Sequence, residues 1–466
     1  MKKVNYLIIS ILIMANIGLN AQDKGVISTM MLQNMRQEHE NHTSATAITN
    51  ALSNGNVKNL ALNRANLGKT DHHFKYKVEV KGITDQKSSG RCWMFTGLNV
   101  LRPKIIDKYK LDGFEFSTNY LYFFDILEKS NLFVNEIINT AQSDMDEKRV
   151  EWLFRSPVGD GGVWNSLSNL VEKYGLVPKQ VMPESKNSEN TRMMIRLIRR
   201  KLREDGLELR KMYAGNQGKE KLNLRKNEML AEIYHILALN LGQPPTEFEY
   251  RFVDKDKKIG ETKKYTPLSF FHFCLPNVDF DEYVMLMNDP SRPYHKLYEI
   301  DMDRNVMEGR NWKYINLPND EIKMFALESI KKNEAMYSSC DVGKQLNKDA
   351  GMLATNNYDY EALYGISFGM DKQQRIITRE SGSSHGMALM AVDVDENEKP
   401  VKWQVENSWG IEAGHKGYLT ITDEWFDEYF FRVVILKKFI DAKTLKILEQ
   451  EATLLPPWDP MFGEDE

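Results

Sequence analysis

The chain has 466 residues, of which 42% are hydrophobic and 27% charged, so it can form about three domains with sizeable cores. This composition excludes a collagen-like or wholly disordered chain. Its 62 basic and 66 acidic residues give a net charge of −4, so a nucleic-acid role would need a local basic patch.

The N-terminus has the pattern of a secretory signal peptide over residues 1–21. Lys2 and Lys3 precede an apolar run, and Ala21 offers a small residue at a cleavage position. The alternative is a retained membrane anchor, but the run is shorter than the ~20 apolar residues that a spanning helix needs. We expect cleavage, export to the periplasm or the cell exterior, and no membrane span afterwards. If the signal is not used, the protein stays cytoplasmic.

Polar residues dominate segment 22–75, which we expect to form an N-terminal arm. Alternating apolar residues over 74–80 then predict a short strand. Apolar residues at helical spacing predict buried helices over 119–132 and 164–174.

Residues 191–242 have a strongly helical and strongly charged pattern, with two apolar stripes separated by glycines. The stripes consist of Met194, Leu197, Ile198 and Leu202, followed by Met229, Ile233, Ile236 and Leu237. This spacing predicts a helical hairpin. Its many Lys and Arg residues could contact nucleic acid or an acidic neighbour, but charge runs on helices are usually solvated surface. Residues 320–335 predict a further helix.

Strand patterns dominate the last third of the chain. They cover residues 387–394, 401–405, 418–422 and 431–436. Because helices precede a sheet, the expected fold class is α+β.

Cys92 follows a glycine turn and begins an apolar helical run. A thiol at a helix N-terminus lies at the positive end of the helix dipole, and beside an imidazolium its pKa can fall from ~8.5 to roughly 3.5–7.5. Gln86 lies just upstream, and its side-chain amide together with the Cys92 N–H could form an oxyanion hole. Without these signals Cys92 could equally be a small buried hydrophobe. Three cysteines are too few to crosslink this chain, so at least one thiol is expected to be free.

His385 stands at the head of an apolar strand, which would hold its ring rigidly. Asn407 ends the next strand and can accept the second N–H of an imidazole, fixing its tautomer and orientation. Trp409 could shield that hydrogen bond from water. Alone, His385 could be structural and the segment 407–410 an ordinary turn. Taken together the signals reinforce one another, because Cys92 needs a base, which His385 provides, and His385 needs an orienting partner, which Asn407 provides. No metal or organic cofactor is implied.

Gln86, segment 89–93, His385 and segment 407–410 resemble the papain-like cysteine peptidases, and within them the bleomycin hydrolase and aminopeptidase C group. Further similar stretches are 159–164, 174–179, 183–185, 340–344, 414–418, 423–426 and 458–461. The likeness runs from about Ala45 to the last residue. It implies a papain-like fold with a helical half that carries the nucleophile and a β half that carries His and Asn.

The resemblance, together with the signal-like N-terminus in which this chain departs from the better-known, cytosolic members of the group, implies a division of the chain. Its parts are a signal peptide (1–21), an N-terminal arm (22–75), the helical half (76–190), a helical insertion (191–333), the β half (334–451) and a C-terminal arm reaching the active site (452–466). Papain-like sequences place the His about 130–150 residues after the Cys, and the longer separation here leaves room for the insertion. In the resembled group such helical additions assemble a caged homohexamer, so a hexamer is expected by resemblance.

The resemblance implies a cysteine aminopeptidase that acts on peptides. Cys92 would attack the scissile carbonyl, Gln86 and the Cys92 N–H would hold the oxyanion, and His385 would protonate the leaving amine. Asn407 would orient His385. Water would then hydrolyse the acyl-enzyme.

Substrate binding is expected at Gly161, Gly162, Trp409 and Glu466. The glycines would let an extended peptide approach the backbone closely. In the resembled group the last residues lie in the cleft, where the terminal carboxylate meets the substrate's α-ammonium and limits cleavage to the N-terminal end. The tail here is more acidic than the small, mostly apolar residues expected, and a frayed tail is the alternative.

Three other functions stay open. An endopeptidase or acyl transferase would use the same triad, and a nucleic-acid-binding or scaffolding particle would use the basic helix. An inert chamber would have lost catalysis, but the intact set of four residues argues against it. Peptides are the expected substrates, and nucleic acid is not an expected partner.

Overall fold

The chain divides into two units. The computed structural model describes residues 25–69, 71–80 and 82–462. The predicted signal peptide and Glu466 lie outside these residues. The smaller unit contains the described residues up to Ala65 together with Tyr358–Phe368, and the larger unit contains Asn66–Asn357 and the chain from Gly369 onward.

The smaller unit is helical, although its sequence shows only weak helical periodicity. Its helices are α2 (Thr29–Asn41), α3 (Ala45–Asn54), α4 (Val57–Ala61) and α14 (Tyr360–Tyr364). The Ser28 hydroxyl accepts the backbone N–H of Met31 at 3.2 Å and so caps the first of them. The Asp359 N–H donates to the Ala61 carbonyl at 2.7 Å, which ties the two segments of this unit together.

The larger unit contains several α-helices, and the first of them begins at Cys92. They are α5 (Cys92–Tyr109), α6 (Thr118–Asn139), α7 (Lys148–Arg155), α8 (Trp164–Tyr174), α9 (Lys186–Glu189) and α12 (Pro267–Cys274). The Ser117 hydroxyl accepts the N–H of Tyr120 at 3.0 Å and caps α6. The buried helices predicted over 119–132 and 164–174 are confirmed as α6 and α8.

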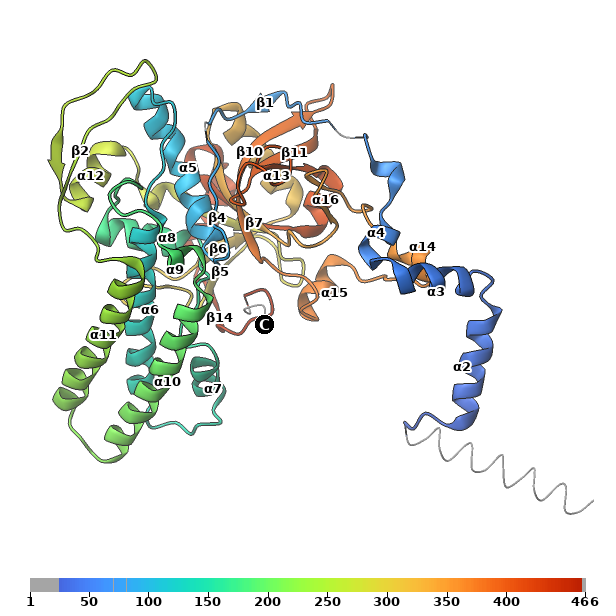
Figure 1. The fold of residues 1–466 in the computed structure, drawn as a ribbon, viewed down its shortest axis with the longest axis horizontal. Coiled ribbons are helices and arrows are strands. Elements are labelled where there is room, and N and C mark those ends of the chain that lie inside the picture. The colour runs from blue at the N-terminus through green and yellow to red at the C-terminus, as the bar shows by residue number, and fades with distance from the viewer. Residues whose placement is uncertain (1–24, 70, 81, 463–466) are drawn as a thin grey trace, which may run out of the picture. The chain divides into compact units, whose positions relative to one another are not determined.

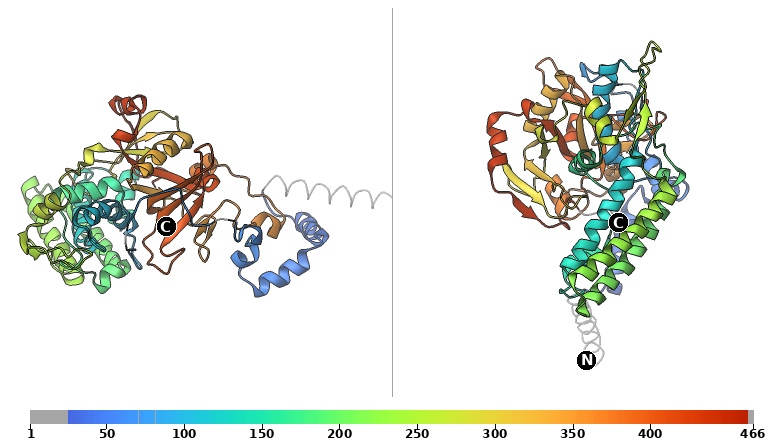
Figure 2. Two further views of the ribbon diagram at one scale, coloured as in Figure 1. Left: turned by 90° about the horizontal axis from the view of Figure 1, so that it is seen from above. Right: turned by 90° about the vertical axis from the view of Figure 1, so that its left-hand side faces the viewer.

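The charged hairpin is also confirmed, as α10 (Arg192–Ala214) and α11 (Lys219–Leu241). Both helices run beside α6 (Figures 1 and 2). Ile198 and Leu202 are buried as expected, but Leu197 is 49% exposed, so its place on the apolar face was predicted wrongly. It lies one position from Ile198, outside the stripe that faces α6.

Several arginines of α10 are engaged within the fold. Arg199 donates through Nε to the Val158 carbonyl, and Arg203 donates to the Phe154 carbonyl at 2.8 Å. Arg210 donates to the carbonyl of Thr140 at 2.9 Å. These cations therefore satisfy carbonyls around α7, and the basic pattern of α10 has a structural role there.

A mixed sheet forms the rest of the larger unit. Within the described residues it has 12 strands, ordered β14-β5-β6-β4-β13-β7-β10-β11-β12-β9-β8, with β1 paired to β10. The strands are β1 (Tyr76–Lys77), β4 (Tyr283–Met287), β5 (Lys296–Ile300), β6 (Lys313–Asn316), β7 (Met336–Cys340), β8 (Leu346–Asn347), β9 (Met352–Leu353), β10 (His385–Val394), β11 (Pro400–Glu406), β12 (Tyr418–Thr422), β13 (Phe430–Leu436) and β14 (Thr453–Leu455). The four strands predicted after residue 386 are confirmed as β10 to β13. The strand expected over 74–80 shortens to β1.

The helix α13 and several short elements complete the fold. They are η1 (Arg64–Asn66), β2 (Phe248–Tyr250), β3 (Lys263–Tyr265), η2 (Phe280–Glu282), α13 (Asn319–Lys331), α15 (Lys372–Ile377), α16 (Asp423–Tyr429), η3 (Lys437–Phe439), α17 (Ala442–Leu445) and η4 (Lys446–Glu449). The helix predicted over 320–335 is confirmed as α13. Helices and a mixed sheet in one chain confirm the α+β class.

The segment expected as a helical insertion, 191–333, needs correction. It is helical at the hairpin and at α13, but between them β4, β5 and β6 enter the main sheet. Their apolar residues are buried on both faces of the sheet, so they show no clean alternation. The C-terminal arm likewise contributes a strand, because β14 pairs in parallel with β5.

Two cores lie on opposite faces of the sheet, and β10 belongs to both. Ala388 and Met390 face the core formed with α5 and α8. Met387 and Leu389 face the core formed with α13 and α16. Because side chains alternate along a strand, β10 is fixed from both sides, and Figure 1 shows α5 beside it.

Candidate active site

The thiol of Cys92 lies at the N-terminus of α5. The Arg91 carbonyl accepts the N–H groups of Met94 and Phe95 at 3.0 and 3.1 Å and so starts the helix immediately before the cysteine. The Cys92 side chain is half-buried and free. It is therefore placed where the helix dipole favours a negative charge.

Cys92, His385 and Asn407 come together although they lie far apart in the chain. The side chains of Cys92 and His385 are hydrogen-bonded, and His385 Nε2 lies 2.9 Å from Asn407 Oδ1. Since Nε2 faces Asn407, Nδ1 is the nitrogen left for the sulfur. The three residues thus have the predicted order of contacts.

The electrostatics of this pair favour an ionised thiol. Burial alone would raise the pKa of Cys92, but the charge and hydrogen bond of His385 outweigh burial and hold that pKa below its ordinary value. The backbone N–H groups of Gly386 and Trp93 lower it further. Burial would lower the pKa of His385, yet Cys92 and the hydrogen bond that the ring donates to Asn407 raise it above its ordinary value. Both shifts favour the thiolate–imidazolium form of the pair over the neutral form.

The other two cysteines differ from Cys92. Burial raises the pKa of Cys274 to about 12 and raises the pKa of Cys340 well above its ordinary value. Both side chains are buried and free. Cys92 is thus the cysteine suited to act as a nucleophile.

A close approach of α5 to β10 sets the distance within the pair. A Cβ atom on Gly386 would lie 3.2 Å from Thr96 Oγ1 and 3.3 Å from Trp93 Cα. Glycine at this position therefore lets the two elements pack nearly backbone to backbone.

Gln86 lies in the same site. Its backbone N–H donates to the Ser408 carbonyl at 2.8 Å, which places it beside the residue that follows Asn407. Its side-chain oxygen accepts the Ser408 hydroxyl at 2.7 Å, and its Nε2 donates to the Ser89 carbonyl at 2.7 Å. A primary amide has two N–H groups, so one remains for an oxyanion.

The predicted peptide-binding glycines lie beside the nucleophile helix. The Trp93 indole N–H donates to the carbonyl of Asp160 at 2.7 Å, and the Asp160 carboxylate accepts the Gly90 N–H at 3.1 Å. A Cβ atom on Gly162 would lie 2.6 Å from the Trp93 ring, whereas one on Gly161 would meet nothing within 4 Å. Gly161 is exposed.

Sequence analysis missed Asp160 and Lys129 as parts of this site. Lys129 Nζ donates to the carbonyls of Gly159 and Gly161 and pairs with Asp125 at 2.7 Å. The signal for Asp160 was its position directly before the glycines. Lys129 carried no sequence signal, because it lies in the middle of α6.

Trp409 covers the histidine. The rings of His385 and Trp409 have centroids 5.0 Å apart and are tilted by 37°. The indole therefore covers one face of the imidazole, and its shielding of the hydrogen bond between His385 and Asn407 stays a prediction. Its role in substrate binding stays a prediction.

The C-terminal arm is held against the larger unit as far as Phe462. Asp459 pairs with Arg292 at 2.6 Å, and Met461 is buried. A Cβ atom on Gly382, close before His385, would lie 4.0 Å from the Met461 carbonyl oxygen. The tail thus passes the segment that leads into β10, while Glu466 lies outside the described residues.

Neither a metal-binding cluster nor a membrane span is found in the part of the chain that the structure describes. Nowhere in it do three or more His, Cys, Asp or Glu side chains gather as metal ligands. No helix within the same residues has the length and apolar character needed to cross a bilayer.

Comparison with known proteins agrees with this geometry. Residues 26–462 match the model of the Peptidase C1-like family. The chain is 41% identical to mouse bleomycin hydrolase over 86% of this chain and 90% of that protein. It is 37% identical to aminopeptidase C of Streptococcus thermophilus over 93% of this chain and 98% of that protein. It is also similar to the crystal structure of PepW from Lactobacillus rhamnosis HN001, with a TM-score of 0.90, 37% identity, and coverage of 93% of this chain and 98% of that one.

Proposed function

Because the chain belongs to the Peptidase C1-like family and has the papain-like α+β fold, we propose that it is a cysteine aminopeptidase that hydrolyses the N-terminal residues of peptides. Its relatives named bleomycin hydrolase and aminopeptidase C support this activity. The observation that carries the proposal is the hydrogen-bonded contact between Cys92 and His385, with the pKa of the thiol lowered and that of the imidazole raised.

The reaction follows from the positions of these groups. The Cys92 thiolate attacks the scissile carbonyl, and negative charge develops on the carbonyl oxygen. The free N–H of Gln86 and the Cys92 N–H stabilise that oxyanion. His385 gives its proton to the leaving amine, and the neutral imidazole then deprotonates the water that hydrolyses the thioester. Asn407 keeps the ring oriented through both steps.

Restriction to free N-termini is the second part of the proposal. The tail passes beside Gly382, and its held portion ends only a few residues before Glu466. A carboxylate there attracts a substrate α-ammonium and excludes the interior of a longer chain from the cleft. Endopeptidase or acyl-transferase action on the same triad is the competing function.

A pair of substrates separates these functions. A fluorogenic aminoacyl amide with a free amine is compared with its N-acetylated twin, using the intact chain and a variant that ends at Met461. We expect the intact chain to cleave only the free amine and the shortened chain to cleave both. Cleavage of the acetylated twin by the intact chain would refute exopeptidase action. A Cys92→Ala variant is the inactive control.

We extend the proposal to assembly and location. The resemblance to a hexameric group supports a homohexamer, which native mass spectrometry would test. The charge and apolar pattern of residues 1–21 supports export, which N-terminal sequencing of the mature protein and cell fractionation would test. A monomeric mass, or an intact first residue on protein from the cytoplasm, would refute the corresponding part.

A further inference from the structure

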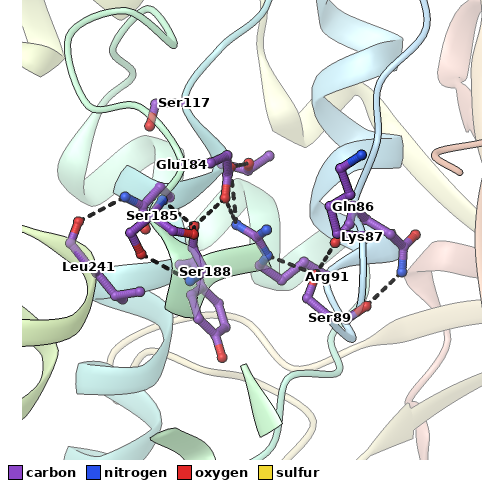
Figure 3. A network of polar contacts seen from close by, with 12 residues as sticks. Gln86, Lys87, Ser89, Arg91, Ser117, Glu184, Ser185, Ser188 and Leu241 are labelled. Carbon is purple, nitrogen blue, oxygen red and sulfur yellow. Dashed lines mark hydrogen bonds and ion pairs between the residues drawn. The ribbon is translucent and has the colours of Figure 1, made fainter. Parts of the chain in front are cut away.

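The turn that carries Gln86 is connected to the helical part of the larger unit by a chain of polar contacts (Figure 3). Gln86 Nε2 donates to the Ser89 carbonyl, and the Ser89 hydroxyl donates back to the Gln86 carbonyl, both at 2.7 Å. Arg91 Nε donates to the same hydroxyl at 3.0 Å. The orientation of the Gln86 amide therefore depends on Ser89, and that of Ser89 depends on Arg91.

Arg91 is itself held by Glu184. Its Nη1 lies 2.9 Å from one carboxylate oxygen of Glu184 and 3.2 Å from the other. The guanidinium also lies over the rings of Phe95 and Tyr122, at 5.2 and 5.3 Å from their centroids. Arg91 has no exposed surface and the Glu184 side chain is only 14% exposed, so salt screens this pair less than it screens a pair on the surface.

Glu184 is in turn fixed by two helices. The hydroxyl of Thr118, at the start of α6, and that of Ser188, in α9, each donate to one of its carboxylate oxygens at 2.5 Å. Ser185 donates to the Asn240 carbonyl at 2.8 Å, which ties the same segment to the end of α11. In Figure 3 Arg91 lies between Glu184 on one side and Ser89 on the other.

We propose that Arg91 and Glu184 form a positioning pair that orients the oxyanion-binding amide of Gln86. The inference rests on the proposed function. Oxyanion donors accelerate a reaction only when they already point to where the charge develops. Arg91 orients the Ser89 hydroxyl, the Ser89 carbonyl holds one N–H of Gln86, and Ser408 holds its oxygen. The second N–H of Gln86 is thereby directed to the oxyanion.

The test separates the oxyanion hole from the nucleophile. Alkylation of Cys92 by iodoacetamide needs the thiolate but no oxyanion donor, whereas amide hydrolysis needs both. We compare Ser89→Ala and Arg91→Lys with the unaltered chain. Arg91→Lys keeps the charge and can still pair with Glu184, but it lacks the Nε donor to Ser89. Glu115→Gln is the matched control, because Glu115 pairs with Lys179 at 2.8 Å on the partly exposed surface of the same part of the fold.

For both variants we expect kcat to fall about tenfold, less than the ~10²–10³ lost when an oxyanion donor is removed outright. KM should stay unchanged, and so should the alkylation rate of Cys92 from about pH 5 to 9. The control should match the unaltered chain in every measurement. Unchanged kcat in the variants would overturn the inference, and so would alkylation that falls in parallel with kcat, since the pair would then act on the nucleophile or the fold. Failure of the unaltered chain to hydrolyse the substrate would instead refute the proposed function.

Discussion

Replacing Gly162 by alanine tests how tightly the loop that contains Gly161 and Gly162 packs against α5. The added Cβ atom would lie 2.6, 2.8 and 2.8 Å from three atoms of the Trp93 ring. These distances are about 0.7–0.9 Å short of the ~3.5 Å at which carbon atoms pack favourably. Trp93 is buried and its indole N–H donates to the Asp160 carbonyl, so a shift of the ring would disturb its packing and this hydrogen bond.

The strain must therefore shift either Trp93 or the loop. Overpacking of this kind costs about 1–3 kcal/mol of the free energy of unfolding. A displacement near 1 Å beside the reacting groups can lower the rate by about 10²-fold. We expect Gly162→Ala to show both effects, measured by urea unfolding and by kcat/KM on a free-amine substrate.

Gly113→Ala is the matched control. A Cβ atom there would meet nothing within 4 Å, and the position lies outside the site. The reasoning is refuted if Gly162→Ala keeps both the unfolding free energy and the kcat/KM of the control.

Other predictions follow from the pKa shifts and contacts. His385→Ala should move the pH midpoint of iodoacetamide alkylation of Cys92 up to or above the ordinary thiol value of ~8.5, because burial then acts without an imidazolium; an unmoved midpoint would contradict the ion pair. Asn407→Ala should lower kcat by up to about tenfold, the loss expected for a hydrogen bond of about 0.5–1.5 kcal/mol; full activity would show that Asn407 does not orient the ring. The rings of His72 and His415 stack with centroids 3.7 Å apart, and burial lowers the pKa of both. Because the unfolded chain then binds protons more readily than the folded chain, the melting temperature should drop as pH falls below about 6.5. His415→Phe keeps a ring but no proton site, and it should weaken that drop; an identical pH dependence would refute the assignment.

The sequence predicted the parts of the site whose chemistry is local. Cys92 at a helix start, His385 at a strand start and Asn407 at a strand end each carry a pattern in their own neighbourhood. Their mutual contact was inferred because each supplies what the others lack, and the structure brings the three together.

Contacts between distant, unpatterned residues could not be predicted in this way. Nothing around Glu184 indicates that it pairs with Arg91, because the pairing depends on how the segment before α9 packs against the turn before α5. Lys129 lies inside α6 without any motif. The sequence shows that such residues are charged, but their burial and partners arise only when separate elements pack together.

The strands β4 to β6 were missed for a related reason. Their buried residues lie on both faces of the sheet, so the alternation that marks a half-exposed strand is absent.

The hairpin α10–α11 was predicted because one face of each helix is buried and the other is solvated, which leaves a clear period in the sequence. Leu197 was assigned to the buried face because it is apolar, but it is exposed. Single exposed leucines are common on protein surfaces, so hydrophobicity alone did not reveal its position.

The close packing at Gly386 has a consequence for the geometry of the site before substrate binds. A Cβ atom added to Gly386 would come within 3.3 Å of the Trp93 Cα atom, so α5 and β10 pack so closely there that a residue larger than glycine would force them to shift. The close packing of these two elements therefore brings the sulfur and the imidazole together in the substrate-free molecule.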